Sequence, residues 1–106
     1  MLEIQVVPQK TKKFLRAVIF LKDAGIDVDA DVSVSFQLPG GKEMIFLPES
    51  SDAPNYIYPE STSRFVHRIE KGIYLLHSRN RALFSAKKIA VNVLYKREKI
   101  CMSFVI

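Results

Sequence analysis

The sequence predicts an all-β fold: two packed antiparallel sheets with seven to eight strands, in a single domain spanning residues 1–106. Apolar and polar residues alternate over most of the chain, and turn-forming residues separate the alternating runs. Hydrophobic residues make up 48% of the chain and charged residues 25%. This is an ordinary globular balance, and a chain of 106 residues is long enough to bury one core.

The clearest strand is the stretch DVSVSFQL, residues 31–38, whose apolar side chains all fall on one face. The PGGK turn follows, in which Pro39 supplies the fixed φ of a second turn position and Gly40 the positive φ of a third. Residues 43–47, EMIFL, form the returning strand of this predicted hairpin.

Other alternating runs predict further strands at residues 2–7, 13–21, 64–69, 73–78, 88–96 and 99–106. The first of these ends at Pro8, and the last two form a terminal hairpin across a short polar connection. The run at 13–21 has apolar residues on both faces, which favours a central position in a sheet.

Two segments do not follow the strand pattern. Residues 78–88, SRNRALFSAKK, have fair helix propensity over a short span, so either a helix or a loop fits them. Residues 48–62 contain three prolines and predict a long surface loop with a short edge strand at 56–58.

The stretch RIEKGIYLLHS, residues 68–78, predicts a structural corner. In immunoglobulin-like sandwiches a tyrosine near the start of the penultimate strand hydrogen-bonds back to the upstream chain. Here Glu70, Gly72 and Tyr74 fit the order that announces such a tyrosine. Gly72 allows a sharp turn, and Tyr74 can bury its ring while its hydroxyl finds a partner. An antibody domain would have a cysteine at Leu76 and a core tryptophan, whose role Phe36 can fill.

The order of motifs along residues 13–95 resembles bacterial and archaeal immunoglobulin-like modules of the macroglobulin or surface-protein kind. The motifs are Ala30, the strand at 31–38, the PGGK turn, the 48–62 loop and the Gly-Ile-Tyr at 72–74. The chain departs from that pattern in having Glu70 as the acidic residue and an extra strand at 99–106. The resemblance implies an immunoglobulin-like sandwich that acts as a non-catalytic spacer or binding module of a larger assembly. Its partners would be another protein or neighbouring domains.

Charge is distributed unevenly along the chain, whose net charge is +5. Residues 1–62 carry six Lys/Arg and nine Asp/Glu, whereas residues 63–106 carry ten Lys/Arg and two Asp/Glu. Two interpretations stay open: a basic face that binds an anionic partner, or acidic and basic strands that neighbour each other. The alternative function is therefore binding of nucleic acid or an anionic polymer through residues 64–99. The candidate contacts are Arg64, Arg68, Arg79, Arg81, Lys87, Lys88, Lys96, Arg97 and Lys99, with Tyr56, Tyr58 and Phe84 as possible stacking residues.

The acidic residues Asp23, Asp27, Asp29 and Asp31 could begin a site for a hard cation. The calcium-loop pattern is broken, because Val32 replaces its glycine and Leu38 its final glutamate. We therefore expect solvated loop acids, with cation binding left open, and we assign no metal site.

The remaining reactive residues do not form a recognisable catalytic set. His67 and His77 could be cross-strand neighbours, but no further metal ligand or nucleophile accompanies them, so we expect structural or surface roles. The single cysteine, Cys101, allows no internal disulfide. We expect no catalytic residues, no cofactor and no enzymatic activity.

No apolar run approaches the ~20 residues of a membrane-spanning helix. The first residues lack a basic region followed by an apolar one, so we expect no signal peptide. An excised module would be extracellular or on the cell surface; otherwise we expect a cytoplasmic protein.

Overall fold

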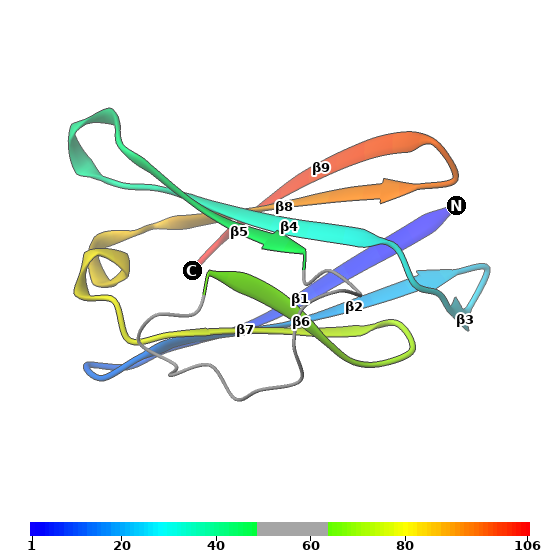
Figure 1. Ribbon diagram of the computed structural model, residues 1–106, viewed down its shortest axis with the longest axis horizontal. Helices are drawn as coiled ribbons and strands as arrows, with labels where there is room; N and C mark the ends of the chain where they lie inside the picture. Colours follow the sequence, from blue (N-terminus) through cyan, green and yellow to red (C-terminus); the bar gives the residue numbers. More distant parts are fainter. Residues whose placement is uncertain (49–63) are drawn as a thin grey trace.

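The computed structural model describes residues 1–48 and 64–106, and these residues form an all-β structure (Figure 1). The strands are β1 (Leu2–Lys10), β2 (Leu15–Asp23), β3 (Ile26–Asp27), β4 (Asp31–Gln37), β5 (Glu43–Pro48), β6 (Phe65–Glu70), β7 (Ile73–Ser78), β8 (Lys88–Tyr95) and β9 (Glu98–Val105). Two short 3-10 segments are η1 (Pro39–Gly41) and η2 (Arg81–Ser85). The all-β prediction is confirmed. The edge strand predicted at 56–58, and the loop around it, lie outside the described residues.

The strands form a single sheet in the order β1-β2-β7-β6-β5-β4-β8-β9, with β3 paired to β2. We call β1-β2-β7-β6 the first half-sheet and β5-β4-β8-β9 the second half-sheet. Pairing within each half is antiparallel, and the halves face each other as a nearly closed barrel (Figure 1). They are joined by a short parallel pairing of β5 with β6, Leu47 opposite Phe65 and Pro48 opposite Val66.

The prediction of two separate antiparallel sheets with seven to eight strands is not matched in full, because the strands form one nearly closed sheet and two further details differ. The described residues include nine strands, because the two-residue β3 has too few residues to show alternation in the sequence. One pair is parallel, and parallel neighbours require a connection of a dozen or more residues. Residues 49–63 provide that length between β5 and β6.

The core lies between the two half-sheets and follows from the alternation of the strands. In β2, β4 and β8 every second side chain is buried, and the buried set from β4 is Val32, Val34 and Phe36. Phe36 meets Phe46 of β5 edge-on, with ring centroids 5.8 Å apart. The alternation predicted for residues 31–38 therefore gives the core-facing side of β4, although the strand itself ends at Gln37.

Three local predictions can be compared with the structure. The central position predicted for residues 13–21 is confirmed, because β2 lies between β1 and β7. Pro8 does not end β1, since that strand lies at the edge of the sheet, where proline is tolerated. The 78–88 segment forms the 3-10 segment η2, and Leu83 and Ala86 anchor it in the core.

The barrel has two ends with different composition (Figure 1). The corner end comprises residues 23–31, 68–74 and 94–98, and it carries the β2–β3, β6–β7 and β8–β9 turns. The basic end comprises residues 10–14, 38–42 and 79–88, and it carries the β1–β2 turn, η1 and η2. In the part of the chain described here, no helix has the length and hydropathy needed to span a membrane.

Candidate functional site

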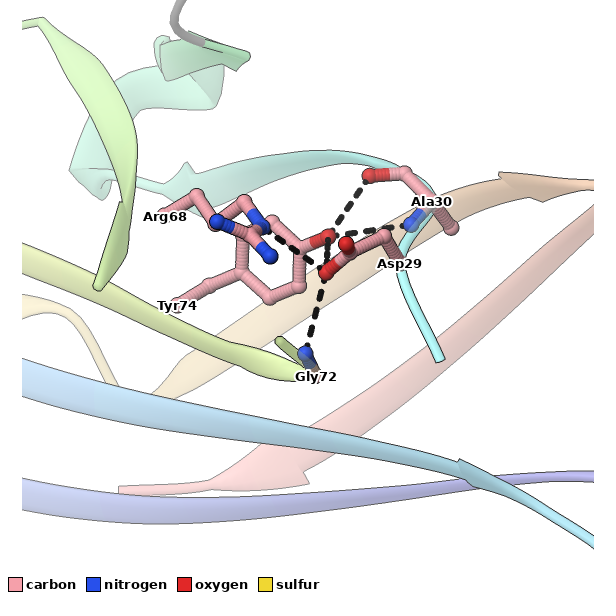
Figure 2. Close-up of polar contacts among 5 residues, drawn as sticks. All are labelled: Asp29, Ala30, Arg68, Gly72 and Tyr74. Atoms are coloured by element: carbon pink, nitrogen blue, oxygen red, sulfur yellow. Dashed lines mark hydrogen bonds and ion pairs between the residues drawn. The ribbon is translucent and has the colours of Figure 1, made fainter. Parts of the chain in front are cut away.

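The corner end is organised around the hydroxyl group of Tyr74 (Figure 2). This oxygen accepts a hydrogen bond from the backbone N–H of Ala30 at 2.9 Å. Its own proton has two acceptors within reach, the Ala30 carbonyl at 3.0 Å and Asp29 Oδ1 at 3.2 Å. The ring of Tyr74 is buried, so the side chain fastens β7 to the segment that leads into β4.

Asp29 is the second centre of this network. Its Oδ1 accepts hydrogen bonds from Arg68 Nε at 2.9 Å and from the backbone N–H of Gly72 at 3.0 Å (Figure 2). These two donors, Arg68 first, lower the pKa of Asp29 from 3.8 to about 2. Burial raises the pKa of Tyr74 above its ordinary value. At neutral pH the pair is therefore a carboxylate and a protonated phenol, and both are poorly matched to general acid–base chemistry.

Gly72 is required at the corner by its conformation and its surroundings. Its φ is +76°, and an added Cβ would lie 2.9 Å from the Leu21 carbonyl oxygen and 3.0 Å from Asp27 Cβ. Tyr74 lies on β7, the third strand from the end rather than the penultimate one, because the β8–β9 hairpin follows it. The position of Tyr74 in the strand order therefore differs from the prediction.

A hollow of about 800 Å³ opens beside the corner, and Asp29, Asp31, Arg68, Tyr95 and Lys96 contribute to its lining. Tyr95 donates its hydroxyl proton to Asp23 Oδ2 at 2.8 Å, which lowers the pKa of Asp23 and raises that of Tyr95. The ionisable groups of this region are thus largely engaged in contacts that hold the strands together.

The predicted acidic cluster is divided between two networks. Asp23 belongs to the Tyr95 network, and Asp29 belongs to the Tyr74 network. Within residues 1–48 and 64–106, no group of three or more His, Cys, Asp or Glu side chains is placed to hold a metal ion. The sequence did not identify Asp29 as a hydrogen-bond centre. Nothing in the local pattern distinguishes it from Asp27 or Asp31, because its donors, Arg68 and Gly72, lie about 40 residues away in the sequence.

The basic residues predicted as a partner-binding set are divided between the two ends. Arg68, Lys96 and Arg97 lie at the corner end, and Lys99 follows in β9. The basic end holds Arg79, Arg81, Lys87 and Lys88, and Arg64 immediately precedes β6. The two half-sheets therefore do not gather residues 64–99 on one face.

The sequence reading also missed three lysines, Lys10, Lys12 and Lys13, which join the basic end from the β1–β2 turn. The signal that could have identified them is the KTKK at residues 10–13. That stretch lies within residues 1–62, whose net charge is negative, so the charge totals did not draw attention to it.

The strands of the two histidines pair, but His67 and His77 lie diagonally across from each other and not directly opposite. His67 lies opposite Leu75, and His77 lies opposite Arg16. His77 Nδ1 accepts a hydrogen bond from Arg16 Nε at 3.1 Å, and its ring stacks on Phe14 with centroids 5.0 Å apart. These contacts favour the structural role expected for His77.

The outward face of the second half-sheet forms a surface of a different kind. Its central rows hold small and uncharged side chains: Ser33, Ser35, Ala90, Asn92, Cys101 and Ser103. Four exposed apolar side chains accompany them: Ile45 (49%), Leu47 (55%), Leu94 (42%) and Val105 (77%). The charged residues on the outward sides of these strands, such as Asp31 and Lys99, lie near the ends of the strands, beyond these central cross-strand rows. A hollow of about 250 Å³ at one end reaches Cys101.

Comparisons of the chain with protein families, with characterised proteins and with solved structures found no match.

Proposed function

We propose that this chain is an immunoglobulin-like β-sandwich acting as a non-catalytic protein-binding module of a larger protein or assembly. The strand orders of the two half-sheets, β1-β2-β7-β6 and β5-β4-β8-β9, support the sandwich interpretation. Among residues 1–48 and 64–106, two residue pairs join the halves through β5 and β6, so the barrel can be treated as two facing layers. The Tyr74 hydroxyl bonds to Ala30, 44 residues upstream, and so joins β7 to the segment that leads into β4, whereas the tyrosine corner of immunoglobulin-like folds reaches the backbone only a few residues upstream.

The observation that carries the binding function is the outward face of the second half-sheet. The outward sides of half-exposed strands normally carry charged residues, which keep the surface soluble and discourage strand association. Here the central rows carry none, and exposed apolar side chains lie among small ones. Protein interfaces have the same pattern, a charge-depleted centre with a polar rim.

The partner that fits this face is another protein, or a neighbouring domain, presenting a flat and largely uncharged patch. Strand β9 borders the face and pairs with β8 alone among the described strands. An open strand edge can add a partner strand through main-chain hydrogen bonds. Small side chains at Ser33, Ala90 and Ser103 would let the backbone of the partner approach closely.

The only cysteine, Cys101, is exposed on this face and supports a direct experiment. The purified protein would be labelled at Cys101 with a benzophenone photo-crosslinker and irradiated in extracts of cells that produce it. A matched control has Cys101→Ser with Gln5→Cys, which places the same label on the exposed outward side of β1. We expect a discrete adduct with a different protein from the Cys101 label and none from the control label.

The variant Ala90→Arg places one charge at the centre of the face, and Gln5→Arg places the same charge on the other half-sheet. We expect Ala90→Arg to abolish the adduct and Gln5→Arg to leave it unchanged. Equal labelling from both positions, an adduct that survives Ala90→Arg, or an adduct of this chain with itself would contradict the proposal.

A further inference from the structure

The basic end presents cations from both halves of the sequence around two adjoining hollows. One hollow, of about 520 Å³, is lined by Lys12, Lys13, Phe14, Arg79, Arg81 and Phe84. The other, of about 400 Å³, is lined by Lys10, Thr11, Lys12 and Phe84. Lys12 and Phe84 belong to both, and among the described residues no carboxylate lines either hollow.

One wall of these hollows is the β1–β2 turn, and its own hydrogen bonds hold it in place. Thr11 Oγ1 accepts hydrogen bonds from the backbone N–H groups of Lys13 at 3.1 Å and Phe14 at 3.2 Å. The backbone N–H of Thr11 donates to the Phe14 carbonyl at 2.9 Å. Lys12 and Lys13 therefore project from a defined turn, and both side chains are exposed.

The opposite wall is the 3-10 segment η2. Asn80 Oδ1 accepts a hydrogen bond from the backbone N–H of Ala82 at 3.0 Å, which caps the start of the segment. Leu83 is fully buried and anchors the segment in the core. Arg81 is exposed and Phe84 half-exposed on the same segment, so a rigid support presents both toward the hollows.

Lys10 connects the two walls. Its ammonium group donates to the Ala86 carbonyl at 3.1 Å and to the Phe84 carbonyl at 3.4 Å. A site whose loops are already tied together loses less conformational freedom when a ligand binds. The same arrangement confines positive charge to a small area, which an anionic ligand would relieve.

We propose that the basic end binds single-stranded nucleic acid, with Lys12, Lys13, Arg79 and Arg81 contacting phosphates and Phe84 stacking on a base. Proteins that bind single strands combine a cationic groove with aromatic platforms, and both are present here. Phe14 already stacks on His77, whereas Phe84 borders both hollows and can be approached from either. The site uses other residues than the protein-binding face and does not depend on it.

The residues of this site differ in part from the anion-binding residues predicted from the sequence. Of the predicted set, Arg79 and Arg81 line the larger hollow, and Lys12 and Lys13 complete it from the N-terminal half. Lys96 and Arg97 lie at the corner end, with Lys96 Nζ 3.7 Å from Asp23 Oδ2. They are not part of this site.

The test uses a fluorescein-labelled 12-residue oligodeoxythymidine and fluorescence anisotropy at 50 and 200 mM NaCl. We expect binding at the lower concentration and about a 50-fold weaker affinity at the higher one, because four cationic side chains contact phosphates. Lys12→Gln/Lys13→Gln should lower the slope of log affinity against log salt by about 1.4. Phe84→Leu, which keeps an apolar side chain without the ring, should weaken binding by about fivefold or more.

The matched control is Lys22→Gln/Lys99→Gln, which removes the same charge from exposed positions on β2 and β9. We expect it to retain the salt slope of the unchanged protein. Arg81→Gln serves as a second site variant if Phe84→Leu lowers the melting temperature.

Failure to bind the oligonucleotide at 50 mM NaCl overturns the proposal, and so do equal losses in the site and control lysine pairs. A heparin dodecasaccharide that competes for the same lysines, with Phe84→Leu without effect on either ligand, would assign the site to a polyanion and reject nucleic acid.

Discussion

The two ends of the barrel use their charges in opposite ways. At the corner end, Asp29 receives hydrogen bonds from Arg68 and Gly72 (Figure 2). Asp23 receives one from Tyr95. At the basic end, Lys12, Lys13 and Arg81 surround two hollows that no described carboxylate lines. Charges at the first end are largely paired within the chain, whereas at the second end the described residues place no carboxylate in the lining of the two hollows.

The difference indicates a division of labour between stability and binding. A network of satisfied hydrogen bonds fixes the arrangement of strands at the corner end. A group of like charges destabilises the folded state slightly, and proteins retain such groups where a ligand is bound. The following substitutions separate the two roles, beginning with the largest expected effect.

Gly72→Ala should lower the free energy of unfolding by about 2 kcal/mol or more, because it combines a left-handed conformation with a clash. The added Cβ would lie 2.9 Å from the Leu21 carbonyl oxygen. Gly40→Ala, in the turn at the basic end, is the matched control. Gly40 has a φ of +82° but no atom within 4 Å of an added Cβ. We expect it to cost about 1 kcal/mol in urea unfolding. Equal losses would mean that the corner contact contributes nothing beyond backbone strain.

Tyr74→Phe should lower the free energy of unfolding by about 1–3 kcal/mol, because it leaves polar groups of Ala30 without their partner. Tyr95→Phe removes a hydroxyl that contacts Asp23 in a less buried place, and should cost about 1 kcal/mol or less. Urea unfolding of both variants provides the comparison. A Tyr74→Phe midpoint equal to that of the unchanged protein would rule out the corner as a stabilising element.

Stability should fall as the pH is lowered from about 4 toward 2. The pKa of Asp29 is 3.8 when unperturbed and about 2 in the folded protein, so its contribution is present above the first value and lost through the second. The Asp29 side chain is 42% exposed, so screening by solvent keeps the effect modest.

Asp29→Asn should flatten this pH dependence, as measured by urea midpoints between pH 2 and 5. Part of the slope should remain, because the pKa of Asp23 is also lowered, first by Tyr95. Asp31→Asn, which changes a neighbouring acid outside the Tyr74 hydrogen bonds, is measured in parallel as the matched control. An Asp29→Asn slope as steep as that of the unchanged protein would contradict the assignment.

The smallest expected effect is at the basic end. Lys13→Gln should raise the free energy of unfolding by a few tenths of a kcal/mol at low salt, because it relieves repulsion. The gain should vanish at high salt. Lys22→Gln removes a cation opposite Glu3 and should therefore lower the free energy of unfolding slightly. Thermal melting at two salt concentrations compares them. A loss of stability from Lys13→Gln would mean that this lysine supports the fold.

Periodicity in the sequence was sufficient to predict eight of the nine described strands, all but β3, and one face of the core. Alternation in residues 31–38 predicted the buried side chains of β4, and Gly40 has the positive φ expected of its turn. Local pattern could not predict the parallel pairing of β5 with β6, because that pairing depends on where a long connection returns the chain.

The functional residues were predicted less completely than the strands. Gly72 and Tyr74 stand in a short ordered motif, and the structure places them at the Asp29 network. Lys12 and Lys13 are more than 60 residues from Arg79 and meet it only because the β1–β2 turn and η2 lie at the same end. Charge totals along a sequence do not record such pairings, so they did not place Lys12 and Lys13 beside Arg79 and Arg81.

The division between the ends can be tested directly by titrating the 15N-labelled protein with the 12-residue oligodeoxythymidine and following backbone amide resonances. We expect salt-sensitive shifts at Lys12, Lys13, Arg81 and Phe84, with the resonances of Ala30 and Gly72 unchanged. Shifts centred on Ala30 and Gly72, or no shifts at either end, would contradict this division.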